Sequence, residues 1–179
     1  MAREKNITTY TTMEKNVLRF DNLEKAMQGF VENLCTMYKE LLLRDNKKAS
    51  GELIRSIKAK TIRINAGMMI GEISLASYWK YVENGRKPGK WPPFDKILKW
   101  IEVKPVLPRP RNNAKPPTNE QLAFLISRKI GEEGIKPGNQ MNEAIDKVWM
   151  AWKPKIEDAI NADLDTSLGL ILLSLVKKN

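Results

Sequence analysis

The sequence has 179 residues, of which 42% are hydrophobic and 29% charged, and its formal net charge is +10. This size and composition are typical of one folded domain with a real hydrophobic core, and exclude a disordered or fibrous chain. Histidine does not occur in the sequence, which removes the commonest general base and metal ligand, so we expect no catalysis, no cofactor and no metal. The positive charge favours contact with nucleic acid or an acidic partner.

Three features of the sequence bear on location. The first residues, 1–6, are polar and lack the apolar segment of a signal peptide. The single cysteine, Cys35, lies on the apolar stripe of a predicted helix, which indicates a core thiol made in a reducing compartment. The most apolar run, Leu168–Val176, is shorter than the roughly 20 residues that a membrane span needs. We therefore expect an intracellular site of synthesis and no membrane segment.

A long amphipathic helix is the first predicted element. Residues 1 to about 15 have no sustained period and are left as a tail or a short edge strand. From Asp21, a good N-cap residue, apolar residues recur at spacings of three and four as far as Leu42, which predicts a helix ending near Arg44. A core helix is favoured over a coiled-coil partner helix, because the stripe covers too few heptads.

A β-hairpin is predicted next. Residues 46–57 open with turn residues and lead into a strand, 58–64, which partly alternates between polar and apolar positions. The turn Asn65-Ala66-Gly67 then leads into a second strand, 68–75. Because an isolated hairpin with one apolar face is marginally stable, we expect the long helix to cover it.

The stretch 78–93 combines aromatic, glycine, proline and basic residues. Residues 77–83 predict two turns of helix with Tyr78, Tyr81 and Val82 facing inward, and Asn84-Gly85 would end this helix in the left-handed region. After Pro92-Pro93 a short amphipathic helix is predicted, with Trp100 to one side and an apolar stripe of Phe94, Ile97, Leu98 and Ile101.

A basic, proline-rich arm is predicted at 86–117, where nine basic and two acidic residues give a net charge of +7. From Lys104 to Pro117, five prolines exclude regular helix or central strand and predict an extended loop. The arm could bind nucleic acid through its charges and through stacking on Trp91 and Trp100, or it could be a solvated loop. We favour a third interpretation, an arm that embraces a neighbouring subunit.

The C-terminal part, 118–179, reads as helical. Thr118 and Gln121 form a capping box that opens a helix ending at Gly131 and Gly134. A further helix follows Asn139, and Pro154 would kink it or start a new one. The final run, 167–176, is apolar nearly all round and is expected to be deeply buried or covered by another chain. The acidic residues form no recognisable catalytic pair, which a hydrolase or nuclease would need.

Two segments flank the predicted hairpin. The turn Ser50-Gly51-Glu52-Leu53-Ile54-Arg55-Ser56-Ile57 precedes it, and Tyr78-Trp79-Lys80-Tyr81-Val82-Glu83-Asn84-Gly85 follows it. Together they resemble the tail-completion and head-tail joining (neck) proteins of tailed bacteriophages, in which similar motifs stand before and after the hairpin, except that Trp79 replaces a small residue. The resemblance covers roughly residues 20–90, with a smaller element from Gly138 to Ala144. The proline-rich arm and the tryptophan-rich C-terminal third depart from the family pattern.

The resemblance implies an α+β subunit of one domain, 1–179, in which the long helix packs on a small antiparallel sheet, followed by a proline-rich loop and C-terminal helices. It implies a non-enzymatic virion protein that forms a ring in the neck between portal and tail, around the DNA exit path. The alternative is a basic nucleic-acid-binding accessory protein. The motif and fold anchors are Gly51, Leu53, Ser56, Ile57, Tyr78, Tyr81, Val82, Glu83 and Gly85. The candidate contacts with subunits or DNA are Arg86, Lys87, Lys90, Trp91, Lys104, Arg109, Arg111 and Lys115.

Overall fold

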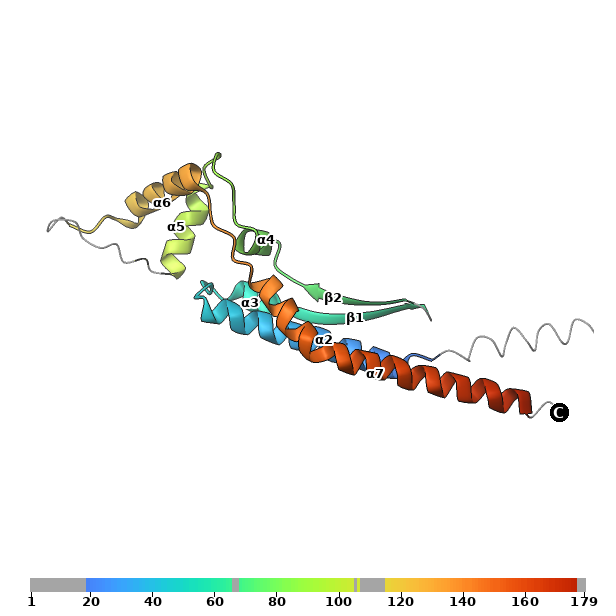
Figure 1. Ribbon diagram of the computed structural model, residues 1–179. Coiled ribbons are helices and arrows are strands. Elements are labelled where there is room, and N and C mark those ends of the chain that lie inside the picture. Colours follow the sequence, from blue (N-terminus) through green and yellow to red (C-terminus); the bar gives the residue numbers. More distant parts are fainter. Residues whose placement is uncertain (1–18, 66–67, 105, 107–114, 177–179) are drawn as a thin grey trace, which may run out of the picture. The chain divides into compact units, whose positions relative to one another are not determined.

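The computed structural model describes residues 19–65, 68–104, 106 and 115–176, with the side chains of all but 61–65 (Figure 1). Most of these residues are helical, and two strands form one antiparallel sheet, so the predicted α+β class is confirmed. The elements in chain order are α2 (Asp21–Arg44), α3 (Glu52–Ser56), β1 (Lys58–Asn65), β2 (Met68–Ser74), α4 (Trp79–Glu83), α5 (Phe94–Val103), α6 (Asn119–Glu133) and α7 (Gln140–Val176).

The chain divides into two compact units. Unit 1 contains the first part of α2, the hairpin and most of α7. Its described residues are those up to Met37, Lys58–Ser74 and those from Ile145 onward. Unit 2 contains Tyr38–Ile57 and Leu75–Ala144, and therefore the end of α2, helices α3 to α6 and the first turn of α7.

In unit 1 the hairpin is present as predicted, with α2 against it. Strands β1 and β2 pair from Lys58 opposite Ser74 to Arg63 opposite Met69, with an irregularity before Asn65. Gly71 of β2 lies against the Val31 side chain of α2, so the expectation that the helix covers the sheet is confirmed at this point. The described residues bury β2 only in part, because Met69 and Ile73 are intermediate and its other positions are exposed.

Helices α2 and α7 run side by side in opposite directions in unit 1 (Figure 1). Gly29 allows the Trp152 indole to lie directly on the α2 backbone, and Phe30 packs edge-on to Trp149 with ring centroids 6.1 Å apart. The buried apolar side chains of this unit are Val31, Leu34, Cys35, Val148 and Ile156. The prediction that Cys35 is a core thiol is therefore confirmed.

Helix α7 is a single helix that continues through Pro154, so the predicted start of a new helix there is wrong, while the alternative of a kink at Pro154 stays a prediction. Ser167 is buried, but beyond it the described residues leave the end of α7 largely exposed, and Leu172 is 63% exposed. Of the two expectations for 167–176, deep burial within the chain is therefore wrong beyond Ser167, and cover by another chain stays a prediction. By length and composition alone, α7 is apolar enough to cross a membrane, with a mean hydropathy of 1.5 over its most apolar window.

In unit 2 the core lies where α5 meets α6. Ile101 of α5 and Leu122 and Ala123 of α6 are buried together, and Val106 packs against them. A second buried group comes from the end of α2 and from the α3 segment, and consists of Tyr38, Leu41, Leu42, Leu53 and Ile57. The predicted capping box at the start of α6 is confirmed, since Thr118 Oγ1 accepts from the Gln121 N–H and Gln121 Oε1 accepts from the Thr118 N–H.

Candidate assembly surface

The two segments that carry the family resemblance meet in unit 2. Residues 52–56, expected as a turn leading into a strand, form the short helix α3, with Gly51 at its N-terminus in the left-handed region (φ 77°). The Ser56 hydroxyl donates to the Leu53 carbonyl and accepts a hydrogen bond of 2.8 Å from the N–H of Ala76. This hydroxyl therefore joins the segment before the hairpin to the segment that follows it.

Glu83, the acidic residue of the second motif, is buried and holds the start of α7. Its Oε2 accepts from the N–H of Met141 at 2.9 Å, and its carbonyl accepts from the N–H of Gly138 at 2.8 Å. A carboxylate at a helix N-terminus is favoured because the first N–H groups have no partner within the helix. Burial raises the pKa of the neighbouring Tyr38 hydroxyl, and the Glu83 carboxylate adds to this effect.

Gly85 is fixed by a close contact between backbones. It has a φ of 66°, and a Cβ atom at this position would meet the Ile135 carbonyl and the Pro137 nitrogen. Arg86 and Ile135 exchange hydrogen bonds of 2.8 and 2.7 Å in an isolated antiparallel bridge. The predicted left-handed glycine is confirmed, and the structure adds the reason that no side chain fits there.

The aromatic residues of the second motif do not face inward as predicted. Tyr81 is 61% exposed and Tyr78 is also exposed, whereas Val82 is partly buried. A five-residue helix such as α4 has too few turns to bury both tyrosines while Glu83 occupies its buried side. Tyr78 and Tyr81 line a groove instead of filling a core.

This groove, here called the Trp100 groove, has a volume of about 550 Å³. The side chains of its walls come from the α4 segment, α5 and α6, and include Tyr78, Tyr81, Val82, Ile97, Trp100 and Ile130. Lys47 and Lys104 also line it, and the Lys104 ammonium donates a hydrogen bond of 2.5 Å to the Asn46 carbonyl. The groove is therefore apolar inside with cationic groups among its lining.

An ion-pair network supports one side of the Trp100 groove. Arg44 contacts Asp45 and Glu143 with nitrogen–oxygen distances of 2.7 Å each, and Gln140 donates to Asp45 at 2.9 Å. The hydrogen bonds from Arg44 and Gln140 lower the pKa of Asp45 to about 2. Asp45 therefore stays ionised beside Arg44, which it shares with Glu143.

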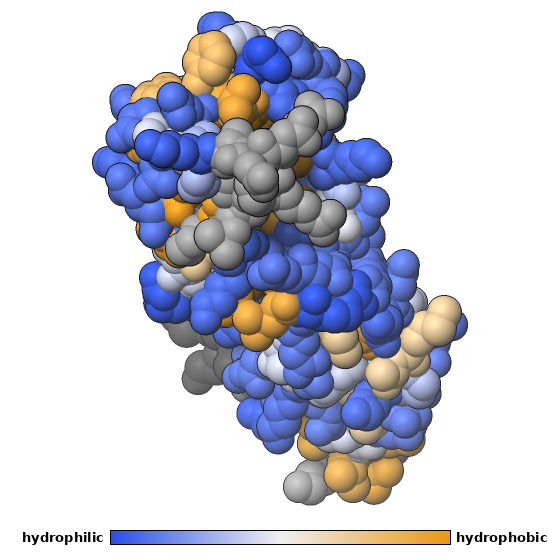
Figure 2. Space-filling view, turned by 90° about the vertical axis from the view of Figure 1, so that its left-hand side faces the viewer, coloured by the Kyte–Doolittle hydropathy of each residue, from blue (hydrophilic) through white to orange (hydrophobic). Residues whose placement is uncertain are grey.

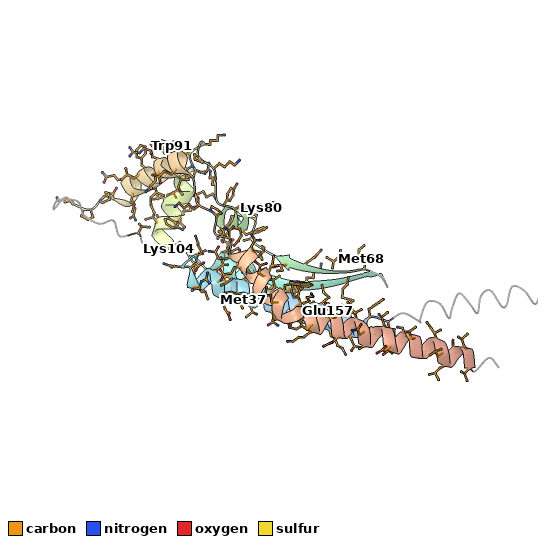
Figure 3. All side chains as sticks on the ribbon, viewed as in Figure 1. Met37, Met68, Lys80, Trp91, Lys104 and Glu157 are labelled. Carbon is orange, nitrogen blue, oxygen red and sulfur yellow. The ribbon has the colours of Figure 1, made fainter. Side chains whose placement is uncertain are left out.

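The predicted contact residues are not one cluster. Trp91 lies on α6 at Gly131, where the absence of a side chain makes room for the indole (Figure 3). Its ring also packs edge-on to Phe124, with the ring centroids 5.5 Å apart. Arg86 donates to the Lys90 carbonyl, so its charge serves the fold of the loop. Lys87, Lys90 and Lys115 are exposed. Arg109 and Arg111 lie outside the described residues, as does most of the predicted proline-rich loop.

Sequence reasoning missed the role of Asp163 in unit 1. It is buried, and its two carboxylate oxygens accept three hydrogen bonds from Asn22 and Leu23 at the start of α2. The sequence pattern predicted Trp100 to one side of its helix and gave no sign of the groove. The one available signal for Asp163 was an acidic residue inside an apolar stripe, between Ile160 and Ser167.

Apolar side chains reach the surface in both units, and Figure 2 shows such groups between hydrophilic ones on one face of the molecule. At the end of α7 they are most numerous: Leu168, Leu170, Leu172, Leu173, Leu175 and Val176 are all exposed. Exposed apolar patches of this kind mark interaction sites in soluble proteins.

Comparison with known proteins finds no family model, no curated protein and no solved structure that matches this chain.

Proposed function

We propose that this protein is a structural, non-catalytic virion protein of a tailed bacteriophage. In this proposal it forms a homo-oligomeric ring in the head-tail connector, joins the portal to the tail and surrounds the DNA exit path. It is made in the host cytoplasm and becomes part of the neck or tail, where its neighbours are portal, neck or tail proteins.

The observation that carries the proposal is the apolar surface left exposed at the end of α7, where Leu168, Leu172 and Leu175 are each more than half exposed. Leucines that the described residues leave in water favour contact with a further apolar surface, because their burial is the main favourable term in association. The order of the two motif segments, and their junction through Ser56, add the resemblance to the neck proteins as a second support.

Native mass measurement and particle imaging test this function. A cyclic oligomer of the purified chain, and the presence of the chain in virions, are the expected results. A chain that remains monomeric and is absent from virions contradicts the proposal.

A basic nucleic-acid-binding accessory protein is the second candidate, because Lys87 and Lys90 are exposed beside Trp91, which is itself partly exposed. It predicts DNA affinity that falls steeply with salt, and a smaller salt slope when these two lysines are replaced by glutamine. Binding that is absent or independent of salt eliminates this candidate.

A further inference from the structure

The buried stripe of α7 continues past the start of α2. Asp163 and Ser167 belong to this stripe and are both buried, and the Arg19 N–H donates to Ser167 Oγ at 3.5 Å. Steps of three and four residues carry the stripe on to Leu170 and Ser174. Leu170 is 44% exposed, and Ser174 is exposed as well. This continuation, here called the α7 extension, is therefore left open by the described residues.

The chain that precedes α2 is attached where the α7 extension begins. The Leu23 N–H donates to Asp163 and the Arg19 N–H donates to Ser167, so the two segments run antiparallel between these contacts. In the same register, residues 10–18 fall opposite residues 168–176, in reverse order. The residues before Arg19 are thus tethered beside the part of the stripe that α2 does not reach.

Residues 7–18 have the length and the pattern to cover the α7 extension. As a helix they would be about 18 Å long, against about 13 Å for residues 168–176. Their apolar side chains recur at steps of three, three and four residues, on one helix face: Ile7, Tyr10, Met13 and Val17. The opposite face is polar: Thr8, Thr12 and Lys15. These steps are too few to predict a helix by themselves, but they match the register that α7 provides.

We propose that residues 7–18 form a helical segment that packs antiparallel on the α7 extension, with Met13 beside Ser174 and Val17 beside Leu170. The occupant of this part of α7 is then the N-terminal segment of the same chain. Residues 19 and 20, which are not helical, form the turn between this segment and α2. The Asp163 carboxylate accepts from the first N–H groups of α2 and so holds this turn against α7.

The leucines that carry the proposed function stay outside this contact. Leu168, Leu172 and Leu175 lie about a third of a turn around α7 from the α7 extension. The N-terminal segment therefore covers one face of the end of α7 and leaves another face open for a neighbouring subunit. Cover of the α7 extension does not depend on assembly, so it goes beyond the proposed function.

A lipid bilayer is the competing partner for the end of α7. By length and composition, an 18-residue window of α7 is apolar enough to cross one. The last eighteen residues of α7 include Asp163, whose carboxylate accepts from the N–H groups of Asn22 and Leu23. Insertion would break these hydrogen bonds and place an unpaired carboxylate in lipid, which is costly. Cover by the N-terminal segment keeps them intact.

Disulfide cross-linking in the full chain tests the pairing. Met13→Cys combined with Ser174→Cys should form a disulfide within one chain under mild oxidation, because the pairing brings the two Cα atoms within the required distance of about 7 Å. The matched control combines Met13→Cys with Leu172→Cys, at a 63% exposed position on another face of α7, and should give at least about tenfold less disulfide. Cys35 is buried and stays out of the reaction. Mass measurement of proteolytic fragments from the monomeric fraction gives the yields.

Three outcomes of this experiment overturn the proposal. Equal yields at positions 172 and 174 show that the segment has no fixed place on α7. The absence of a disulfide at both positions shows that the segment lies elsewhere. The third outcome comes from mixing Met13→Cys protein with Ser174→Cys protein: as much disulfide between chains as the double variant forms within one shows that the segment covers a second copy.

Amide hydrogen exchange measured by mass spectrometry gives an independent readout. Val17→Lys places a charge in the contact and should raise the exchange rate of residues 168–176 at least about tenfold. Thr12→Lys, on the polar face, is the matched control and should leave this rate at the wild-type level. Equal rates in the wild type and in Val17→Lys overturn the contact. Protection of residues 168–176 that appears only with phosphatidylcholine–phosphatidylglycerol vesicles overturns it in favour of a membrane.

Neither readout requires a ring, so failure of the cover and failure of the proposed function are distinguishable. A chain that stays monomeric and forms the disulfide between positions 13 and 174 contradicts the proposed function and keeps the cover of α7. A ring whose subunits do not form this disulfide keeps the proposed function and overturns the cover.

Discussion

The carboxylate of Asp163 on α7 closes the N-terminal end of α2: its Oδ2 accepts from the N–H of Leu23 at 2.8 Å, and its Oδ1 accepts from the N–H of Asn22 at 3.1 Å. The first N–H groups of a helix have no partner within it, and a side chain that satisfies them stabilises the helix. Here that side chain comes from a residue 140 positions away in the sequence. Asp163 therefore links the two long helices of unit 1 through the end of one of them.

Replacement of Asp163 by alanine should lower the free energy of unfolding by about 1–3 kcal/mol, because three donors at the start of α2 lose their acceptor. Asp163→Asn keeps one acceptor oxygen and should cost less. Urea denaturation followed by circular dichroism measures both. The control is Asp165→Asn at an exposed position, which should change stability by less than about 0.5 kcal/mol. Equal losses in the Asp163 and Asp165 variants would contradict the capping role.

Gly85→Ala should destabilise unit 2 by at least about 1–3 kcal/mol. The new methyl group would meet the Ile135 carbonyl, and the φ of 66° is itself unfavourable for alanine. Thermal unfolding of the variant provides the measurement. Gly169→Ala in α7 is the matched control: its Cβ would have open space and a helical backbone, so stability should stay level or rise by up to about 1 kcal/mol. A tolerated Gly85→Ala would show that the bridge at Arg86 is not fixed.

Gly131→Ala should cost about 1–3 kcal/mol, because its methyl group would overlap the Trp91 indole. The prediction is tested by a double-mutant cycle with Trp91→Ala. If the indole packs on Gly131, the alanine at 131 should be nearly free of cost once the indole is removed, so that the two changes are strongly non-additive. Additive costs would indicate that Trp91 leaves this position in solution and is available for stacking on a partner.

The Asp45 network predicts a pH dependence at acid pH. The pKa of Asp45 falls from 3.8 to about 2 on folding, so between these values the unfolded chain binds more protons than the folded one. The contribution of Asp45 to stability is therefore complete above about pH 4 and is lost as the pH falls through about 2. Urea unfolding across this range should show stability rising with pH.

Asp45→Asn removes the titrating carboxyl group, so the free energy of unfolding should change less with pH between about 2 and 4. Arg44→Gln removes the main cause of the low pKa of Asp45, the hydrogen bonds from Arg44, and should move the loss of stability to higher pH. An unchanged profile in both variants would show that other carboxyl groups dominate acid unfolding.

The sequence determined the local elements of this protein. The apolar spacing from Leu23 to Leu42 predicted α2, the turn at residues 65–67 predicted the hairpin, and Thr118 with Gln121 predicted the capping box. These features depend on interactions between residues a few positions apart, so periodicity and turn chemistry were enough to find them. The left-handed Gly85 belongs to the same class.

The tertiary structure determined the side-chain orientations, long-range contacts and burial that no local sequence pattern predicts. Tyr78 and Tyr81 have the same local signature whether they face a core or a groove, and it is the burial of Glu83 against the start of α7 that turns them outward. Asp163 caps a helix 140 residues earlier, and Pro154 sits within an unbroken α7 because packing overrides the local preference. The apolar run at 167–176 was visible in the sequence, but its burial depends on which other atoms surround it. Only the three-dimensional packing showed that the described residues leave this run exposed.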